Sequence, residues 1–329
     1  MISLIGGAGF IGTRLAHRLR HSEKAFDILD IATSPDFPKE TTRVDIRSMD
    51  ALRKAVPEGS LLINLAAVHR DDVRPISLYD EVNVEGSRNI CQVAREKKCE
   101  TIVFTSSVAV YGFAPPGTRE DGEIRYFNDY GRTKWLAEKV YREWQQEDPE
   151  NRTLVIVRPT VVFGEQNRGN VYNLLHQIAS GKFMMVGSGR NIKSMAYVEN
   201  VAAFLEFAST HFKPGIHTYN YIDKPDFDMN SLVSSVRGIL GMSKGEGIHL
   251  PYALGWLAGF FFDVLSRVTG KPYTVSSIRI KKFCATTRFD SSVSETGFVP
   301  EVPMEKGLEK TVRYEFIEDN TDKPIFHTE

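Results

Sequence analysis

Tyr130 and Lys134 lie four residues apart in the amphipathic stretch 127–146. Helical spacing places both side chains on one face, where an ammonium group stabilises a phenolate and lowers the pKa of the phenol toward neutrality. A phenol with such a pKa can both take and give a proton. Ser107 follows the buried stretch 101–106 and offers a hydroxyl to a substrate oxygen. These three residues predict proton transfer at a substrate hydroxyl.

A glycine-rich segment near the start of the chain predicts a dinucleotide cofactor, which would exchange a hydride with the substrate. Gly6-Gly7-Ala8-Gly9-Phe10-Ile11-Gly12 follows the apolar run 1–5 and opens an amphipathic stretch, 13–19. A strand, a glycine turn and a helix in this order hold the pyrophosphate of a dinucleotide at the helix N-terminus. Asp30 ends the next apolar run, about 20 residues on, where a carboxylate binds the ribose and repels a 2′-phosphate. The sequence therefore predicts NAD as the cofactor, in preference to NADP.

The elements that position these residues alternate between strand and helix. The pattern predicts strands at 26–31, 60–66, 101–106 and 153–157 and helices at 77–97 and 127–146, the latter with Glu138, Arg142 and Glu143 on its solvent side. Such alternation is typical of a parallel sheet covered by helices on both faces. We expect an α/β chain of the Rossmann type with a doubly wound parallel sheet.

The alternation stops beyond Gly164, which indicates a second, smaller domain. We expect an NAD-binding domain that comprises residues 1–165, to which the chain returns around residues 193–220. A C-terminal substrate-binding domain would then comprise 166–192 and 221–329, with an apolar segment at 250–265.

Composition narrows the classes of protein that fit. The 329 residues carry a formal net charge of −1, so no overall field attracts nucleic acid. Cys91, Cys99 and Cys284 show no metal-ligand spacing, and an odd number of cysteines favours reduced thiols in a cytoplasmic protein without a metal. No apolar run has the length of a transmembrane span.

The motifs resemble those of the extended short-chain dehydrogenase/reductase superfamily, in its nucleotide-sugar epimerase/dehydratase branch. That branch carries Gly-x-x-Gly-x-x-Gly, Tyr-x-x-x-Lys, and a Ser or Thr four residues before the tyrosine of Val-Tyr-Gly, which here is Tyr111. The resemblance implies that Tyr130 is the acid and base, that Lys134 holds the nicotinamide ribose and that Ser107 orients the substrate hydroxyl. It also implies a homodimer that forms through two long helices. Further cofactor contacts implied in this way are Asp45, Ile46, Leu65, Ala66, Ala67, Asn83 and Arg158.

Several segments are similar to a small group within that branch, the bacterial 4-epimerases that act on N-acetylglucosaminyl-diphospho-undecaprenol in O-antigen assembly. They include 69–73, 167–172, 181–187, 249–252 and 281–287. This similarity implies a lipid-linked diphospho-sugar as substrate and an enzyme at the inner face of the cell membrane. Sugar dehydratases of the superfamily carry an Asp-Glu pair where this chain has Val108-Ala109, so reversible oxidation at C4 fits better than loss of water.

Candidate substrate contacts are mainly cationic. Lys193 stands where the superfamily usually places an arginine on the substrate diphosphate, and a lysine binds phosphate as a point charge without a bidentate fork. Arg168 and Arg190 lie in flanking loops, beside Asn170, and His69 could line the mouth of the site. The competing interpretation is that these are solvated surface side chains.

The apolar segment 250–265 is relevant to whether the enzyme contacts the membrane that holds a lipid-linked substrate. Residues 250–262 carry no charge, and Arg267, Lys271, Arg279, Lys281 and Lys282 follow. Thirteen helical residues span about 20 Å, short of the roughly 30 Å hydrocarbon core, whereas aromatics followed by basic residues suit a helix in the membrane interface. Gly255 and Gly259 give a weak GxxxG signal. A buried helix or a dimer contact is the alternative interpretation.

Three functions remain open on the sequence. The first is a 4-epimerase of lipid-linked GlcNAc. The second is a soluble UDP-GlcNAc or UDP-glucose 4-epimerase, which has no need of the apolar segment. The third is a dehydrogenase of a hydrophobic alcohol, similar to the 3β-hydroxysteroid dehydrogenases, which would consume NAD.

Overall fold

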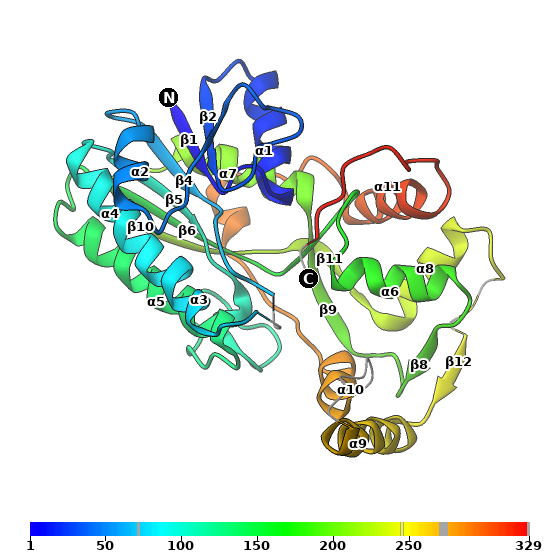
Figure 1. Cartoon of the computed structure of the whole chain (residues 1–329). Coiled ribbons are helices and arrows are strands. Elements are labelled where there is room, and N and C mark those ends of the chain that lie inside the picture. The colour runs from blue at the N-terminus through cyan, green and yellow to red at the C-terminus, as the bar shows by residue number, and fades with distance from the viewer. Residues whose placement is uncertain (71–72, 244, 246, 270–275, 328–329) are drawn as a thin grey trace.

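The computed structural model describes residues 1–70, 73–243, 245, 247–269 and 276–327. Lys271, and residues 71 and 72 of the 69–73 segment, lie outside this described part. The chain forms two lobes side by side (Figure 1). The larger contains the central sheet, and the smaller is built mainly from the second half of the chain.

The central sheet has seven strands, all parallel, in the order β10-β6-β5-β4-β1-β2-β3. Its members are β1 (Ile2–Ile5), β2 (Phe26–Asp30), β3 (Thr41–Arg43), β4 (Leu61–Asn64), β5 (Thr101–Thr105), β6 (Thr153–Pro159) and β10 (Gly215–Tyr221). Chain order reverses between β1 and β4, and ligands bind outside the carboxyl ends of strands at such a point. The sequence-predicted strands are present, and β3 and β10 extend the sheet at its two edges.

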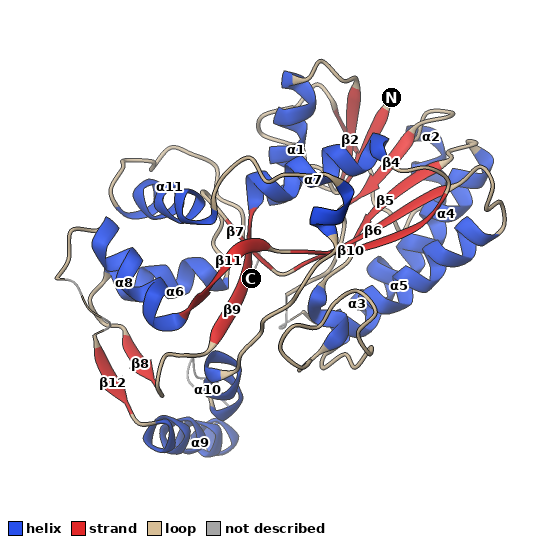
Figure 2. Cartoon of the chain, turned by 180° about the vertical axis from the view of Figure 1, so that it is seen from behind, coloured by secondary structure: helices blue, strands red, loops and turns tan. Residues whose placement is uncertain are grey.

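Helices cover both faces of this sheet, as Figure 2 shows from behind. Helices α1 (Phe10–His21) and α7 (Val198–His211) pack on one face, and α2 (Met49–Ala55), α4 (Gly86–Glu96) and α5 (Asp129–Gln146) pack on the other. The apolar strands are buried from both sides because each face carries its own helical layer. The predicted doubly wound, Rossmann-type fold is confirmed.

The predicted helix at 77–97 is not uniform. It consists of α3 (Ser77–Tyr79), the π-helical turn η1 (Asp80–Glu85) and α4. Short π segments inside helices are frequent at functional sites because they redirect side chains. Asn83, a predicted cofactor contact, lies within η1.

The smaller lobe has its own core. Its three-stranded sheet has the order β11-β9-β7, and three helices pack around it. The strands are β7 (Val161–Phe163), β9 (Ile192–Tyr197) and β11 (Asp223–Asp228), and the helices are α6 (Asn170–Ala179), α8 (Met229–Ile239) and α11 (Met304–Phe316). Residues 193–197 thus belong to this second sheet, and the chain returns to the larger lobe through α7 and β10. The exact domain limits remain a prediction.

A further extension lies at the end of the smaller lobe (Figure 1). Strands β8 (Met184–Val186) and β12 (Ile248–Leu250) pair in parallel and lead into α9 (Tyr252–Thr269) and α10 (Ser277–Cys284). A Cβ at Gly255 would lie 2.5 Å from Cγ1 of Val186, and one at Gly259 would lie 2.7 Å from the backbone nitrogen of Ser277. The two glycines therefore form the inward face of α9, and the GxxxG spacing reflects packing within this chain. In the described part of the chain, no helix is both long and apolar enough to span a membrane.

Candidate active site

The structure brings the three predicted catalytic residues together at the start of α5. The Asn128 side chain caps this helix by accepting from the backbone N–H of Gly131 at 2.9 Å. Tyr130 and Lys134 occupy its first turns, and the Ser107 hydroxyl is close enough to the Tyr130 phenol to lower the pKa of that phenol. Ser107 in turn caps the short helix η2 (Val108–Tyr111) by accepting from the N–H of Ala109 at 3.1 Å. The Tyr130 phenol and the Ser107 hydroxyl thus lie at the starts of two helices, each of which is fixed by a side-chain cap.

The electrostatics of the pair differ from the sequence expectation. Burial raises the pKa of Tyr130 to about 12, although the hydrogen bond from Ser107 works against this rise. Burial also lowers the pKa of Lys134 to about 7. Its Nζ lies 4.7 Å from the ring centroid of Phe104 and 6.0 Å from that of Tyr130. The expected fall of the phenol pKa toward neutrality was wrong, because loss of hydration disfavours both charged forms.

A buried ion pair lies one turn beyond Lys134. Glu138 accepts from Arg158 Nε at 2.8 Å and from Arg158 Nη2 at 2.6 Å, and Ser106 Oγ donates to it at 2.6 Å. The prediction that Glu138 lies on the solvent side of the helix was wrong, since its side chain is fully buried. Only Glu143 is truly exposed among the three residues assigned to that side. The Arg158 guanidinium also donates to the Tyr111 hydroxyl, so a contact between this side chain and NAD remains a prediction.

The glycine loop has the form that a dinucleotide requires. Gly6 has φ of +76°, and a Cβ there would lie 2.5 Å from the backbone nitrogen of Ala66. A Cβ at Gly12 would likewise lie 2.5 Å from Cα of Gly7. Within the described residues no side chain caps the start of α1 at Gly9, and its first turn contains no acidic residue. The N–H groups of that turn are therefore placed for the anionic pyrophosphate of NAD, which the loop fits.

Asp30 lies at the carboxyl end of β2, beside this loop. Its Oδ2 accepts from the N–H of Ala8 at 3.0 Å and its Oδ1 accepts from the N–H of Ala32 at 2.9 Å. These two bonds orient the carboxylate at the carboxyl end of the sheet, beside the glycine loop, where the fingerprint places the ribose. The position fits the predicted role.

The remaining predicted cofactor contacts line the same end of the sheet. Leu65, Ala66 and Ala67 follow β4. The Asn83 side chain accepts from Val68 N at 2.8 Å and donates to Val68 O at 2.9 Å and to Thr133 Oγ1 at 3.0 Å. Asn83 thereby ties the loop after β4 to the catalytic helix.

Asp45 and Ile46 lie in the loop that follows β3 and precedes α2. Asp45 pairs with Arg47 at 2.6 Å, and this guanidinium holds the pKa of the Asp45 carboxyl below its usual value. Ile46 is buried against Gly86, where a Cβ would lie 2.5 Å from its Cδ1. Their proposed contact with the adenine remains a prediction.

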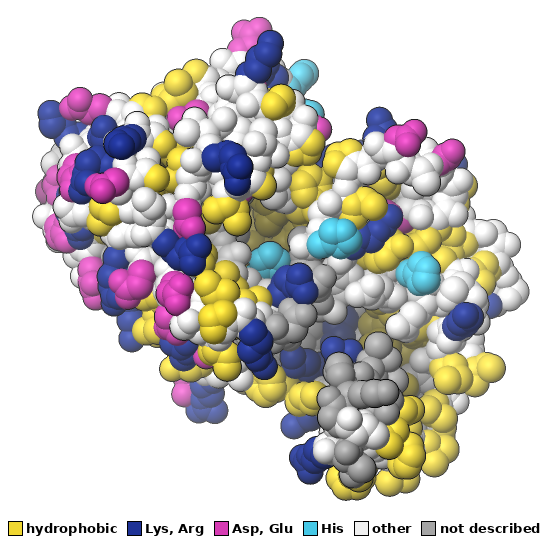
Figure 3. Space-filling model, viewed as in Figure 1, with side chains coloured by type: hydrophobic (Ala, Val, Ile, Leu, Met, Phe, Trp, Pro, Cys, Tyr) yellow, Lys and Arg dark blue, Asp and Glu magenta, His cyan; other side chains and the backbone are white. Residues whose placement is uncertain are grey.

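The predicted substrate contacts occupy the smaller lobe and the loop after β4. Between the lobes the surface is hollowed, and cationic side chains and histidines lie around this hollow (Figure 3). Lys193 lies on β9, and its Nζ donates to the carbonyls of Lys282 at 2.9 Å and Ala285 at 2.6 Å. Burial lowers the pKa of Lys193 to about 8. Arg190 is exposed in the loop before β9.

The other candidates have partners of their own. Arg168 pairs with Glu315, and its guanidinium carbon lies 4.0 Å from the Tyr172 ring centroid. Asn170 is the first residue of α6. His69 is exposed, and its Nδ1 lies 3.4 Å from the carbonyl oxygen of Ala67. A role for each of them at the substrate remains a prediction.

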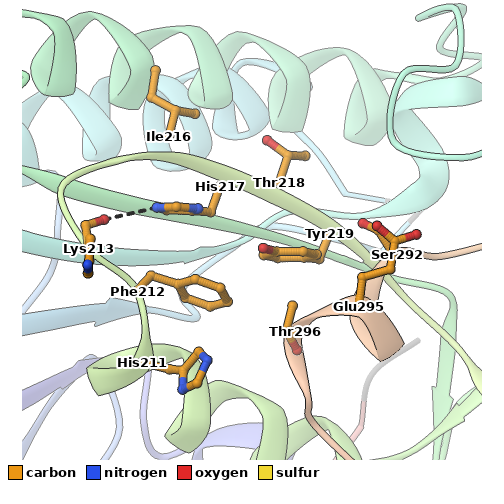
Figure 4. Close-up of a pocket in the computed structure, with 10 residues that line it drawn as sticks. All are labelled: His211, Phe212, Lys213, Ile216, His217, Thr218, Tyr219, Ser292, Glu295 and Thr296. Carbon is orange, nitrogen blue, oxygen red and sulfur yellow. Dashed lines mark hydrogen bonds between the residues drawn. The ribbon is translucent and has the colours of Figure 1, made fainter.

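A separate pocket of about 670 Å³ opens at the edge strand β10. It is lined by residues of the segment 211–219, most of them aromatic or histidine, by Ser292, and by Glu295 and Thr296 of the helix η3 (Val293–Thr296), as Figure 4 shows. Among its described lining residues none is a predicted site residue. The predicted site residues therefore lie apart from this pocket.

Comparison with known proteins agrees with this geometry. Residues 2–221 match the model of the NAD dependent epimerase/dehydratase family, and the chain belongs to that family. It is 48% identical to N-acetyl-alpha-D-glucosaminyl-diphospho-ditrans,octacis-undecaprenol 4-epimerase of Escherichia coli O157:H7, an alignment that covers 100% of this chain and 99% of the relative. The cofactor prediction, NAD, is confirmed by the family.

More distant relatives correspond to the two alternative functions. The chain is 24% identical to a sterol-4-alpha-carboxylate 3-dehydrogenase of Candida albicans, over 94% of this chain and 96% of the relative. A solved UDP-Glc/GlcNAc 4-epimerase from Campylobacter jejuni superposes with a TM-score of 0.75, at 15% identity, over 96% of this chain and 98% of that one. At such identity the second comparison supports the fold alone.

Proposed function

We propose that this chain is an NAD-dependent 4-epimerase that interconverts GlcNAc- and GalNAc-diphospho-undecaprenol by way of a 4-keto sugar, in the assembly of O-antigen or a related surface glycan. The observation that carries this proposal is the 48% identity to an epimerase of that substrate, which extends over the whole of this chain. The two more distant relatives share half as many residues or fewer.

Tyr130 is the proton carrier in this proposal. Its phenolate takes the proton of the C4 hydroxyl as C4 is oxidised, and its phenol returns that proton to the same oxygen after the keto sugar has turned over. Ser107, whose hydroxyl lies close to the phenol, holds the C4 oxygen beside it. Because burial raises the pKa of Tyr130, the phenolate needs nearby positive charge. Lys134, whose Nζ lies 6.0 Å from the Tyr130 ring centroid, would supply it.

NAD held by the glycine loop and Asp30 would supply reversible hydride transfer at C4 and would not be consumed. The chain offers no acid for a competing loss of water at the positions that dehydratases use. Val108 and Ala109 stand there, both in η2. An epimerase therefore fits this site better than a dehydratase does.

We further propose that α9 brings the site to the inner face of the cell membrane. Its outward side exposes an apolar band formed by Tyr252, Leu254, Trp256, Leu257, Phe260, Phe261 and Val264. Yellow surface over α9 marks this band in Figure 3. A contiguous exposed apolar surface on a helix, with basic residues beyond it, suits the interface of a bilayer. A soluble UDP-sugar epimerase has no use for it.

Vesicle binding tests the membrane proposal. Replacing Trp256, Phe260 and Phe261 with serine should reduce co-sedimentation with vesicles that contain anionic phospholipid and should leave the unfolding transition unchanged, because these side chains already face solvent. Unfolding of the variant, or vesicle binding equal to that of the unaltered protein, would show that the band packs against protein.

The epimerase reaction itself is tested with purified protein, GlcNAc-diphospho-undecaprenol and a catalytic amount of NAD. We expect GalNAc to appear on the lipid, with no NADH accumulating in proportion to product. Accumulation of one NADH for each sugar oxidised would instead support a dehydrogenase.

A homodimer is proposed from the superfamily pattern, through α4 and α5 on the outer side of the larger lobe. Sedimentation velocity at micromolar concentration should then give twice the 37.1 kDa mass of the chain. A monomer under these conditions would contradict the dimer and leave the chemistry above unaffected.

A further inference from the structure

Two phenylalanines lie half-exposed beside the catalytic residues. The ring centroids of Phe113 and Phe127 are 4.9 Å apart, with an angle of 74° between the ring planes. Their side chains are 48% and 49% exposed. Phe127 precedes Tyr130 by three residues, and Phe113 follows directly on the segment that carries Ser107. The aromatic pair is therefore close in the chain to both Tyr130 and Ser107.

The two segments that carry these rings are fixed to each other. The N–H of Arg125 donates to the carbonyl of Val110 at 3.1 Å. Gly112 has φ of +61°, and its backbone lies so close to the Arg125 carbonyl that a side chain there has no room. The rings are thus presented to solvent by a tightly packed backbone, at the cost of keeping large apolar surface in water.

Helix α10 of the smaller lobe places cations on both rings. Lys281 Nζ lies 5.6 Å from the Phe113 centroid, and Lys282 Nζ lies 5.1 Å from the Phe127 centroid. The backbone carbonyl of Lys282 accepts from Lys193, so the end of α10 carries two lysines and contacts a third. Such a cluster next to a sugar-oxidising site is complementary to a diphosphate.

The same helix is fixed to the apolar band of α9. The Asp263 side chain, on α9, accepts from Ser277 N at 3.1 Å and from Ser277 Oγ at 2.5 Å. Gly259 packs directly on the backbone of Ser277. Helix α10 therefore connects the aromatic pair and the two lysines to the helix that carries the apolar band, and Figures 1 and 2 both show α10 against α9.

We infer that Phe113, Phe127, Lys281 and Lys282 form a recognition site for the polyprenyl diphosphate portion of the substrate. The lysines bind the diphosphate, and the rings contact the first isoprene units as these leave the sugar toward α9. The inference rests on the proposed function and names the residues that distinguish a lipid carrier from a nucleotide carrier.

The competing explanation is that the rings and lysines merely hold the two lobes together. The test compares Phe113→Ala/Phe127→Ala with the unaltered protein on two substrates, GlcNAc-diphospho-undecaprenol and GlcNAc-diphosphate capped with a methyl group. Because apolar contact is lost only for the lipid, kcat/KM for the undecaprenyl substrate should fall roughly tenfold or more, with little change for the methyl substrate. Equal losses on both substrates, or no loss on either, would overturn the inference.

Two further double variants test separately the role of the aromatic rings and the role of the lysines. Phe113→Leu/Phe127→Leu keeps an apolar surface but removes the aromatic faces, so it should retain most of the activity on the lipid if isoprene contact is what matters. Lys281→Gln/Lys282→Gln should raise KM for both substrates, because both carry the diphosphate. Val299→Ser, at an exposed apolar residue distant from α10 in the sequence, is the control. An unaltered protein that epimerises UDP-GlcNAc but not the lipid-linked sugar would overturn the proposed function, and this inference with it, before any variant is made.

Discussion

Glu138 and Arg158 form a bidentate ion pair, at 2.8 and 2.6 Å, directly behind the catalytic helix face. The side chains are 0% and 2% exposed. Glu138 lies one turn after Lys134 and is the negative charge that opposes the effect of burial on that lysine's pKa. Glu138 of the helix, held in place by Arg158 of β6, therefore stabilises the charged form of Lys134.

Removing the charge of Glu138 should be costly. Glu138→Gln leaves the Arg158 guanidinium buried without its anionic partner, and breaking a buried pair in this way destabilises a protein by about 3–5 kcal/mol. Glu143→Gln is the matched control on the same helix, because Glu143 is exposed and should change stability by less than about 0.5 kcal/mol. Urea unfolding measures both, and equal midpoints for the two variants would contradict the role given to the pair.

Lys134→Met should stabilise the protein without NAD, in a pH-dependent way. The folded pKa of Lys134 is about 7, against an ordinary value of 10.5. At and below about pH 7 the lysine is charged in both states, and folding carries the full cost of burying that charge. Between 7 and 10.5 only the unfolded chain binds the proton, so the cost shrinks as pH rises.

The methionine removes this cost. We expect a gain of roughly 1–3 kcal/mol at pH 6–7 that declines toward pH 10, measured by urea unfolding across that range. A gain that is independent of pH, or one that grows as pH rises, would show that Lys134 is not desolvated as described.

Tyr130→Phe removes the group that carries the substrate proton but keeps the ring. Epimerisation should fall by roughly 10²–10⁴-fold or more, while NAD binding and the unfolding transition stay close to those of the unaltered protein. Calorimetric titration with NAD verifies that the site is intact. Near-normal turnover in this variant would reject Tyr130 as the proton carrier.

Asp30 should set the choice of cofactor. Its carboxylate, held by the N–H groups of Ala8 and Ala32, would repel a 2′-phosphate on the adenosine ribose. Asp30→Asn keeps the size and acceptor oxygen but loses the charge, so the preference for NAD over NADP in calorimetry should drop by roughly tenfold. Equal affinity of the unaltered protein for both cofactors would contradict the assignment.

The features that the sequence predicts best are local ones. The glycine loop, Asp30 and the Tyr130–Lys134 spacing each depend on a few neighbouring residues, because a turn or one helical turn decides which side chains meet. Burial of Glu138 was missed because its partner, Arg158, comes from β6, 20 residues further along the chain. The π-helical turn around Asn83 was missed because its hydrogen bonds to Val68 and Thr133 join three separate segments.

The pKa of Tyr130 was mispredicted for a related reason. Spacing indicates that Lys134 is near, but only the packing of Phe104 and the surrounding strands shows how far both groups are desolvated. Which face of α9 points outward could not be predicted for the same reason, because Val186 and Ser277, which pack against its glycines, come from other segments of the chain.

The central claim is that the sugar reaches this enzyme on a lipid. The most direct measurement compares kcat/KM for GlcNAc-diphospho-undecaprenol with kcat/KM for UDP-GlcNAc, both assayed with the same purified protein, NAD and detergent micelles. Since the apolar band and the aromatic pair are proposed to act only on the isoprenoid, the account predicts that the lipid-linked sugar is preferred by roughly a hundredfold or more. Equal use of the two substrates, or a preference for UDP-GlcNAc, would contradict it.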